Sequence, residues 1–315
     1  VGGTGSRFGL DGFNIRGIGG NRVLTMVDGI RVPDEFSFGP FLSARRDFVD
    51  IDSVNRVEIA RGPVSSAWGS DALGGVVAFT TSSPSAVLGD DRFKSKIKVG
   101  YSSADDSVVT TLQTAGKVDE LSALISYTRR ESSETDNQGK VGGTSQSRER
   151  PDPQSMTTEN LSLKVAFEPT PDTRLLLSLE QFDNETDSIL LSDAGTISRG
   201  TLIESRTAAD TRDRTRVSLR LDLNVDAVIA DTVSAKIYNQ SSETLQKLDE
   251  TRMPPPYMSP QFRKRDSMFE QTLKGASFEV TKAFTVGNSD HSLTYGVERF
   301  ETESESTRDG GTVDS

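Results

Sequence analysis

The sequence predicts an all-β protein in which a small, compact α+β unit in residues 1–83 is followed in residues 84–315 by part of a transmembrane antiparallel β-barrel. Short apolar runs between glycine-rich turns fill the first part. Beyond Ser85, apolar and polar residues alternate over long stretches. The connections between those stretches alternate in length, which is typical of barrels with tight turns at one end and long loops at the other.

The first part begins with short strands, expected at Phe13–Gly17 and within Val23–Arg31. The Asp28-Gly29 pair inside the second segment is a strong hairpin signal, since both residues tolerate a positive φ. Residues 17–20 are glycine-rich, as in phosphate-binding loops. Such a loop needs a helix directly after it, and residues 23–27 predict a strand instead, which argues against nucleotide binding.

Residues 56–81 predict a strand, a sharp turn, a short helix and a second strand. Val57 and Ile59 alternate with polar residues, as in a strand with one buried face. The Gly62-Pro63 pair ends this strand because proline has no amide hydrogen to donate. Ser65-Ser66 is suited to capping the short helix.

The second part predicts strands with one apolar and one polar face. The alternation is clearest at residues 161–167 and 217–225, where every second residue is apolar. A soluble β-sandwich strand would show the same pattern, so alternation alone leaves both architectures open. The candidate strands cover approximately residues 93–102, 107–117, 120–132, 158–168, 173–184, 212–226, 232–247, 268–284 and 290–303.

The lengths of strands and connections favour the barrel. Most candidates are about ten residues or longer, which suits tilted membrane strands. Short turns alternate with long polar loops at 133–157, 185–211 and 248–267. Large outer-membrane barrels with a filled lumen have about 22 strands, so about nine strands lead us to expect a fragment of a longer chain.

Composition excludes several classes of function. The chain has no cysteine and a single histidine, His291, so thiolate chemistry and multi-histidine metal sites are excluded. A net charge of -11 argues against nonspecific nucleic-acid binding. No apolar run reaches the roughly 18 residues of a membrane-spanning helix. Carboxylates are plentiful, but none is paired with a nucleophile or a metal cluster, so an enzyme is not expected.

Residues 12–83 resemble the plug domain of the TonB-dependent outer-membrane receptors. The resemblance rests on Asn14-Ile15-Arg16-Gly17, on Val27-Asp28-Gly29-Ile30-Arg31 and on residues 56–81, in the order that the family uses. The family's structural signature then falls on Arg16, Gly17, Asp28, Gly29, Arg61, Gly62, Pro63, Gly74 and Gly75. The resemblance implies outer-membrane transport, not catalysis or adhesion.

The same resemblance implies partners. TonB would act through a segment ahead of the plug that this sequence does not include, and the barrel would contact outer-membrane lipid. By resemblance, Arg16 and Arg61 would pair with carboxylates of the barrel wall, because a buried arginine needs a counter-charge.

Residues 17–22, 48–52 and 65–77 look most like the haem and haemoglobin branch of the family. The expected cargo is haem, bound as a transported ligand with no permanently bound cofactor. A ferric siderophore, cobalamin or another nutrient remains the alternative.

Residues 33–48 fall where a plug presents a loop toward the outside. Their aromatic and basic side chains would stack on a porphyrin and pair with its propionates. The alternative is that the phenylalanines pack the plug against the wall. No histidine lies in the plug, and a tyrosine of an outer loop is the remaining candidate for an axial iron ligand. The candidate ligand residues are Phe36, Phe38, Phe41, Arg45, Arg46 and Tyr257.

Overall fold

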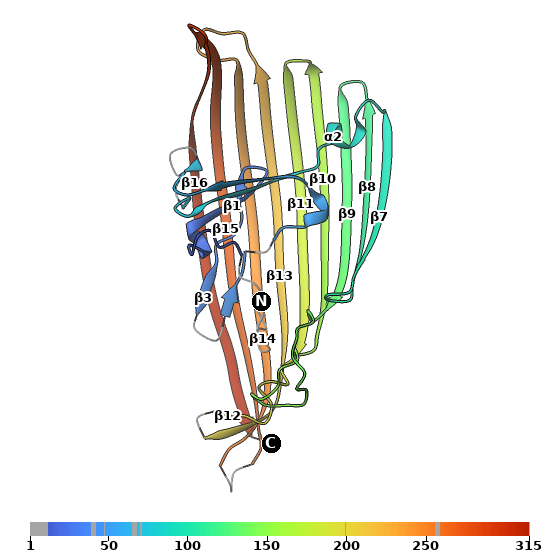
Figure 1. The fold of residues 1–315 in the computed structure, drawn as a ribbon, viewed down its shortest axis with the longest axis vertical. Coiled ribbons are helices and arrows are strands. Elements are labelled where there is room, and N and C mark those ends of the chain that lie inside the picture. Colours follow the sequence, from blue (N-terminus) through green and yellow to red (C-terminus); the bar gives the residue numbers. More distant parts are fainter. Residues whose placement is uncertain are drawn as a thin grey trace.

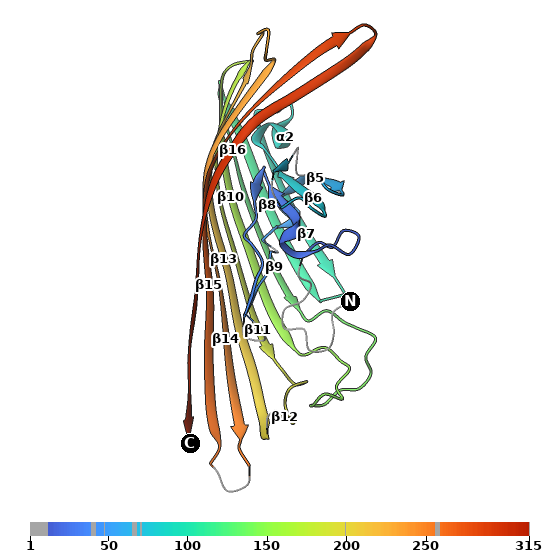
Figure 2. The ribbon, with the colours of Figure 1, turned by 90° about the vertical axis from the view of Figure 1, so that its left-hand side faces the viewer.

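A computed structural model of the chain describes residues 12–38, 42–46, 48–64, 68–69, 71–198, 200–255 and 259–314. A small mixed sheet, formed by residues up to Thr81, lies against the concave side of a long, curved antiparallel sheet (Figure 1, Figure 2). We call the small unit the plug and the long sheet the wall. The predicted fold class is confirmed.

The plug sheet has the order β2-β1-β6-β5, with β1 parallel to β6 and the other pairs antiparallel. Apolar side chains of β1 and β6 pack on both faces of this sheet, which makes the plug a unit with its own core. A separate hairpin and two 3-10 turns complete it. The elements are η1 (Gly20–Arg22), β1 (Val23–Val27), β2 (Ile30–Arg31), β3 (Phe36–Phe38), β4 (Leu42–Ala44), η2 (Ile51–Ser53), β5 (Val54–Arg61) and β6 (Gly75–Thr81).

Two tight turns of the plug use a pair of positive φ angles. Asp28 (φ 52°) and Gly29 (φ 70°) join β1 to β2, as the sequence predicts. Arg16 (φ 53°) and Gly17 (φ 86°) form a second such turn, closed by reciprocal backbone hydrogen bonds between Ile15 and Ile18. The strand expected at residues 13–17 is therefore wrong, because consecutive positive φ angles reverse the chain.

The predicted strand before the Gly62-Pro63 turn is confirmed as β5, but its buried face is wrong. Val57 is 43% exposed and Ile59 is 57% exposed. The reason is position, because β5 is the outer strand of the plug sheet and pairs only with β6. The serines expected to cap the following helix lie outside the described residues.

The wall contains every long strand that the sequence predicts, each paired with its neighbour along the chain. The helix α2 (Pro84–Leu88) leads into it, with Leu88 packed on Ala115 and Leu124. The wall strands are β7 (Phe93–Ser102), β8 (Ser107–Val118), β9 (Leu121–Ser133), β10 (Gln154–Thr170), β11 (Thr173–Ile189), β13 (Thr201–Asn224), β14 (Thr232–Met253), β15 (Gln261–Val286) and β16 (Ser289–Asp314), with the two-residue β12 (Ile197–Ser198) paired to β13.

The connections 119–120, 171–172, 225–231 and 287–288 gather at the upper end in Figure 1. At the lower end lie the short turn 103–106 and the longer connections that follow β9, β11 and β14. Two of those longer connections are shorter than the sequence predicts, at 190–200 and 254–260. The difference arises because β13 to β16 have 24, 22, 26 and 26 residues. At roughly 3.3 Å per residue such strands far exceed the roughly 30 Å of a bilayer core. Polar sequence that resembles a loop is here an extended hairpin.

The alternation along the wall separates its two faces as predicted. On β10, Leu161 and Phe167 are exposed on the convex face, whereas Asn160 and Lys164 are buried on the concave face, next to the plug. Among the described residues, no helix is long and apolar enough to cross a bilayer.

A row of carboxylates crosses the convex face beyond its apolar band. Each carboxylate of the row is directly opposite the next one on the neighbouring strand, from β10 to β16. The residues before and after it on its own strand face the concave side. Like charges in opposing positions repel, so this row costs stability. Its members are Glu159, Asp183, Asp213, Glu243, Glu270 and Glu305.

Candidate functional site: the interface between plug and wall

The turn between β1 and β2 inserts a carboxylate among wall cations. Lys164 donates from Nζ to Asp28 Oδ2 at 3.0 Å, and Arg216 Nη2 lies 3.9 Å from the same oxygen. The Thr81 amide donates to the other oxygen, Oδ1, at 2.8 Å, and the Thr81 hydroxyl donates to Oδ2 at 2.6 Å. Burial alone would raise the pKa of Asp28, but Lys164, Arg216 and the Thr81 hydrogen bonds lower it to about 2. Asp28 is therefore ionised at neutral pH.

The wall cations around this turn also bind the plug backbone. Arg216 Nη1 donates to the Val27 carbonyl at 2.9 Å, and Lys236 Nζ donates to the Asp28 carbonyl at 2.7 Å. A buried carboxylate on the wall, Glu180, pairs with both Arg214 and Arg216. These contacts join β1 and β2 to three wall strands.

A second set of plug carboxylates binds the wall on the other side of the plug. Asp52 is nearly buried and pairs with Arg130 at 2.8 Å and with Lys98. Asp50 accepts a hydrogen bond from Asn160 Nδ2 at 3.4 Å, and burial raises its pKa. The plug thus presents anions, and the wall supplies the cations.

Three wall glutamines bind backbone groups of the plug, in β2, in β4 and in the loop at Asp34. Gln246 accepts from the Ser43 amide at 2.9 Å and donates to the Ser43 carbonyl at 3.2 Å, as a neighbouring strand would. Gln271 accepts from the Asp34 amide at 2.8 Å, and Gln240 donates to the carbonyl of Arg31 at 3.1 Å. Buried backbone groups need such partners, so the side-chain amides of the three glutamines help to hold the plug against the wall.

Arg31 of the plug contacts the wall at β16, the last strand of the sheet. Its Nη1 donates to Asp71 Oδ2 within the plug at 2.8 Å, and Glu298 of β16 lies 3.8 Å from Nη2. Its guanidinium also lies over the Phe300 ring, 4.6 Å from the centroid.

The arginines that the resemblance assigns to this interface lie elsewhere. Arg16 and Arg61 are exposed, and in the part of the chain that the structure describes neither forms an ion pair. The sequence reasoning missed the wall cations that take this role. A signal was present for two of them, because Lys164 and Lys236 each stand between two apolar residues, at positions that face the concave side.

Two signature glycines have a steric role. Gly75 has φ 146°, and a Cβ there would lie 2.3 Å from the Ala60 carbonyl oxygen. A Cβ on Gly74 would lie 2.7 Å from the Ile18 side chain. Gly62, with φ 99°, has open space around it but needs the positive φ, and its amide bonds the Gly74 carbonyl at 3.0 Å.

The predicted ligand residues fall into separate environments. Phe36 stacks on Phe269 of β15, with ring centroids 4.6 Å apart, which is the packing alternative that the sequence left open. Arg46 is buried and donates to the Gly20 and Val23 carbonyls. These contacts count against a ligand role for both residues.

Phe38 is 53% exposed at the end of β3, and Arg45 is partly exposed. Phe41 and Tyr257 lie outside the described residues. His291 stacks on Phe284 beside the last short turn, as expected of a rim residue.

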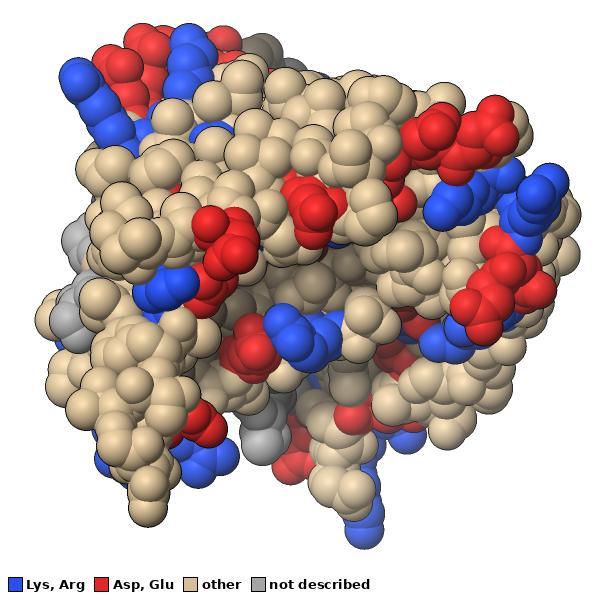
Figure 3. Space-filling view, turned by 90° about the horizontal axis from the view of Figure 1, so that it is seen from above, with Lys and Arg blue, Asp and Glu red and all other residues tan. Residues whose placement is uncertain are grey.

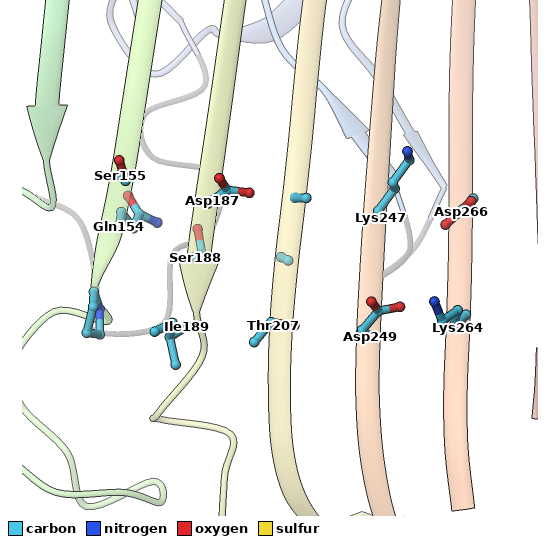
Figure 4. Close-up of a pocket in the computed structure, with 13 residues that line it drawn as sticks. Gln154, Ser155, Asp187, Ser188, Ile189, Thr207, Lys247, Asp249, Lys264 and Asp266 are labelled. Atoms are coloured by element: carbon cyan, nitrogen blue, oxygen red, sulfur yellow. The ribbon is translucent and has the colours of Figure 1, made fainter.

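The described residues contain no cluster of acidic and histidine side chains suited to a metal ion. A depression of about 570 Å³ lies where β10, β11, β13, β14 and β15 extend beyond the apolar band (Figure 4). Asp187, Lys247, Asp249, Lys264 and Asp266 line it from the convex face, so it lies outside the lumen. Seen from the short-turn end, the molecule is hollowed between plug and wall, with acidic and basic side chains around the hollow (Figure 3).

Comparisons with known proteins agree with this architecture. A family profile described as TonB-dependent Receptor Plug Domain matches residues 1–76. The "Hemoglobin-haptoglobin-binding protein A" of Haemophilus influenzae is 32% identical over 192 residues, which is 56% of this chain and 18% of that protein. The "Hemoglobin-binding protein A" of the same species is 27% identical over 264 residues, 78% of this chain and 26% of that protein.

A solved structure of the FrpB iron transporter from Neisseria meningitidis has the same fold. It superposes with a TM-score of 0.60 at 14% identity, over 94% of this chain and 54% of that one. The chain spans roughly a fifth to a quarter of the length of the relatives it matches.

Proposed function

We propose, from the premise that this chain carries the plug of a TonB-dependent receptor inside part of its outer-membrane β-barrel, that the protein imports haem across the outer membrane. Receptors of this family are transporters and not enzymes. The observation that carries the choice of cargo is the naming of the relatives that are about 30% identical, which are described as haemoglobin-binding or haemoglobin-haptoglobin-binding proteins. Haem taken from haemoglobin is the cargo that those names support.

The interface supports a reversible plug. Its strongest contacts are side chains of the wall on carboxylates and backbone of the plug, at Asp28, Asp52 and Ser43. Such contacts can be broken and remade, whereas a continuous apolar interface would resist the entry of water. We assign residues 1–83 to the plug and 84–315 to the barrel, with TonB as the partner that displaces the plug. Phe38 and Arg45 of the plug remain proposed ligand residues, and Phe41 and Tyr257, which lie outside the described residues, stay proposals from the sequence.

A second cargo class is favoured by one observation. The only histidine of the sequence is His291, which stacks at the rim, so the plug offers no imidazole to haem iron. A ferric siderophore, which brings its own iron ligands, needs none. This alternative keeps the same fold and the same interface.

Titration of the whole receptor separates the two. Haemin and haemoglobin are added to purified receptor while the Soret band is followed, and growth on haem iron is compared in strains with and without TonB. Haem uptake predicts a saturable Soret shift and growth that depends on TonB. Absence of both, with retained binding of a ferric siderophore, would replace haem by the alternative.

A further inference from the structure

Six arginines lie on the concave face of the wall. Arg212 and Arg308 are level in register with Phe269 and Gln246, which contact the plug, and the other four lie further toward the end where the wall extends past the plug. Figure 2 shows that part of the wall. The orientation of the six arginines follows from the alternation of each strand. Gln246 of β14 and Gln271 of β15 bind the plug, and the arginines of these strands are an even number of residues away. The six are Arg206, Arg212, Arg252, Arg263, Arg265 and Arg308.

The register of the strands brings these side chains together. Arg206 of β13 is opposite Glu250 of β14, which is opposite Arg263 of β15. Arg252 and Arg265 follow two residues along their strands, and Arg308 of β16 is opposite Ser267. Opposing and diagonal neighbours in a sheet lie roughly 5 to 8 Å apart. Residues from four strands therefore form one basic surface, which we call the arginine vestibule.

Few carboxylates face these arginines. Glu250 pairs with Arg206 and with Arg252, whose Nε lies 2.9 Å from it. Asp193, from the connection before β12, lies 2.7 Å from Arg206. By register, Asp210 and Asp314 are further carboxylate positions on this face, and among the described residues Arg263 forms no ion pair.

The positive sign is local. The whole chain carries a net charge of -11, and the convex face of the same strands carries four of the six carboxylates in the row, on β13 to β16. Only the lumenal side of these strands is basic. A cleft lined by one sign of charge concentrates ligands of the opposite sign.

The vestibule also leads to the plug. Arg212 lies deepest on β13, two residues before Arg214, whose guanidinium faces the Phe48 ring of the plug. Basic side chains thus continue from the open end of the wall to the plug.

We propose that the arginine vestibule is a binding site for carboxylate-bearing cargo, which it holds by charge-assisted hydrogen bonds before the cargo reaches the plug. Guanidinium groups bind carboxylates in a bidentate manner, and two or more arginines on adjacent strands suit a ligand with two carboxylates. For haem these are its propionates, and for a ferric chelate they are the free carboxylates. The inference rests on the proposed uptake function for the direction in which the cargo passes.

The test uses the whole receptor with Arg263→Gln/Arg265→Gln. The matched control is Lys264→Gln, which removes a positive charge between the same two residues but on the convex face. A charge-conserving variant, Arg263→Lys/Arg265→Lys, reports on folding. The probes are haemin, its dimethyl ester without free carboxylates, and ferric citrate. Binding is measured by Soret titration or fluorescence quenching at low salt.

The vestibule predicts that the double Gln variant weakens binding of haemin and ferric citrate by roughly tenfold, with the control and the Lys variant close to wild type. The ester should bind wild type about as weakly as haemin binds the double Gln variant. If haemin binds the double Gln variant as tightly as the wild type, and the ester binds as tightly as haemin, the proposed role of the arginine vestibule is wrong while haem uptake stands. If haemin fails to bind and ferric citrate shows the loss, haem uptake falls and the vestibule stands. Binding of neither anion overturns both.

Discussion

Lys164 on β10 and Asp28 in the first plug hairpin, 136 positions apart in the sequence, meet at 3.0 Å and join the wall to the plug. Asp28 also receives the Thr81 amide and hydroxyl, which fixes the carboxylate within the plug before the wall binds it. This one side chain therefore organises the turn and seats it against three wall strands.

Replacing Asp28 by Asn should loosen the plug. Lys164 would then lose its ion pair and Arg216 would keep only Glu180 as a counter-charge, which costs about 2 kcal/mol of plug stability. Hydrogen exchange of the β1 and β2 amides in the whole receptor measures the effect. Glu58→Gln, on exposed β5, is the control and should change exchange by less than about 0.5 kcal/mol. Equal protection in both variants would show that the ion pair does not hold the plug.

Acid should release the same contact. The pKa of Asp28 is lowered from the ordinary 3.8 to about 2, so its ionised form stabilises the folded state. That contribution, about 2 kcal/mol, is fully present above about pH 4 and is lost as the pH falls toward 2. Plug exchange rates measured between pH 7 and pH 2 should show this loss in the wild type and a flatter profile in Asp28→Asn. Parallel profiles would contradict the assignment.

Two signature glycines should differ in their tolerance of alanine. Gly75→Ala places a Cβ against the Ala60 carbonyl and should cost about 3 kcal/mol or more, because the clash is with backbone. Gly62→Ala has open space and carries only the cost of a positive φ, about 1 to 2 kcal/mol. Thermal unfolding of the two variants tests the order. The reverse order would mean that β5 and β6 can separate at low cost.

Gln246→Ala should expose the backbone of β4. Loss of both hydrogen bonds to Ser43 leaves an amide and a carbonyl without partners, a cost of about 2 kcal/mol. Exchange at the Ser43 amide should rise by more than tenfold. Gln181→Ala, on the convex face of β11, should leave that amide unchanged.

Removing one charge from the carboxylate row should stabilise the wall. Asp213 is opposite Asp183 on one side and Glu243 on the other, so Asp213→Asn relieves repulsion on both sides and should gain about 0.5 to 1 kcal/mol. Asp222→Asn, which loses its contacts with Arg220 and Ser234, should bring no gain. Midpoints of thermal unfolding at low salt compare the two. A loss of stability in Asp213→Asn would indicate that the row is stabilised by a bound cation.

The wall was predicted strand by strand because its signal is local. Alternation with period two needs only neighbouring residues, and it marks the apolar face at Leu161 and at Val217 without knowledge of the partner strand. The ends of β13 to β16 were missed because polar residues on both faces look the same in a loop and in a hairpin outside the bilayer. The strand expected at residues 13–17 is wrong because its apolar and polar residues alternate as in a strand, and this alternation does not show the positive φ angles at Arg16 and Gly17 that turn the chain.

The sequence by itself determined the fold class, the β1–β2 turn at Asp28-Gly29 and the glycines that the plug needs, because backbone conformation and side-chain alternation are properties of short segments. Only the tertiary structure decided which charges meet. Lys164 and Asp28 are far apart along the chain, and their pairing depends on the register of the whole wall and on how the plug sits against it. The tertiary structure likewise placed Phe36 on Phe269, Arg46 inside the plug, and Arg16 and Arg61 on the surface, since burial depends on what packs above a residue.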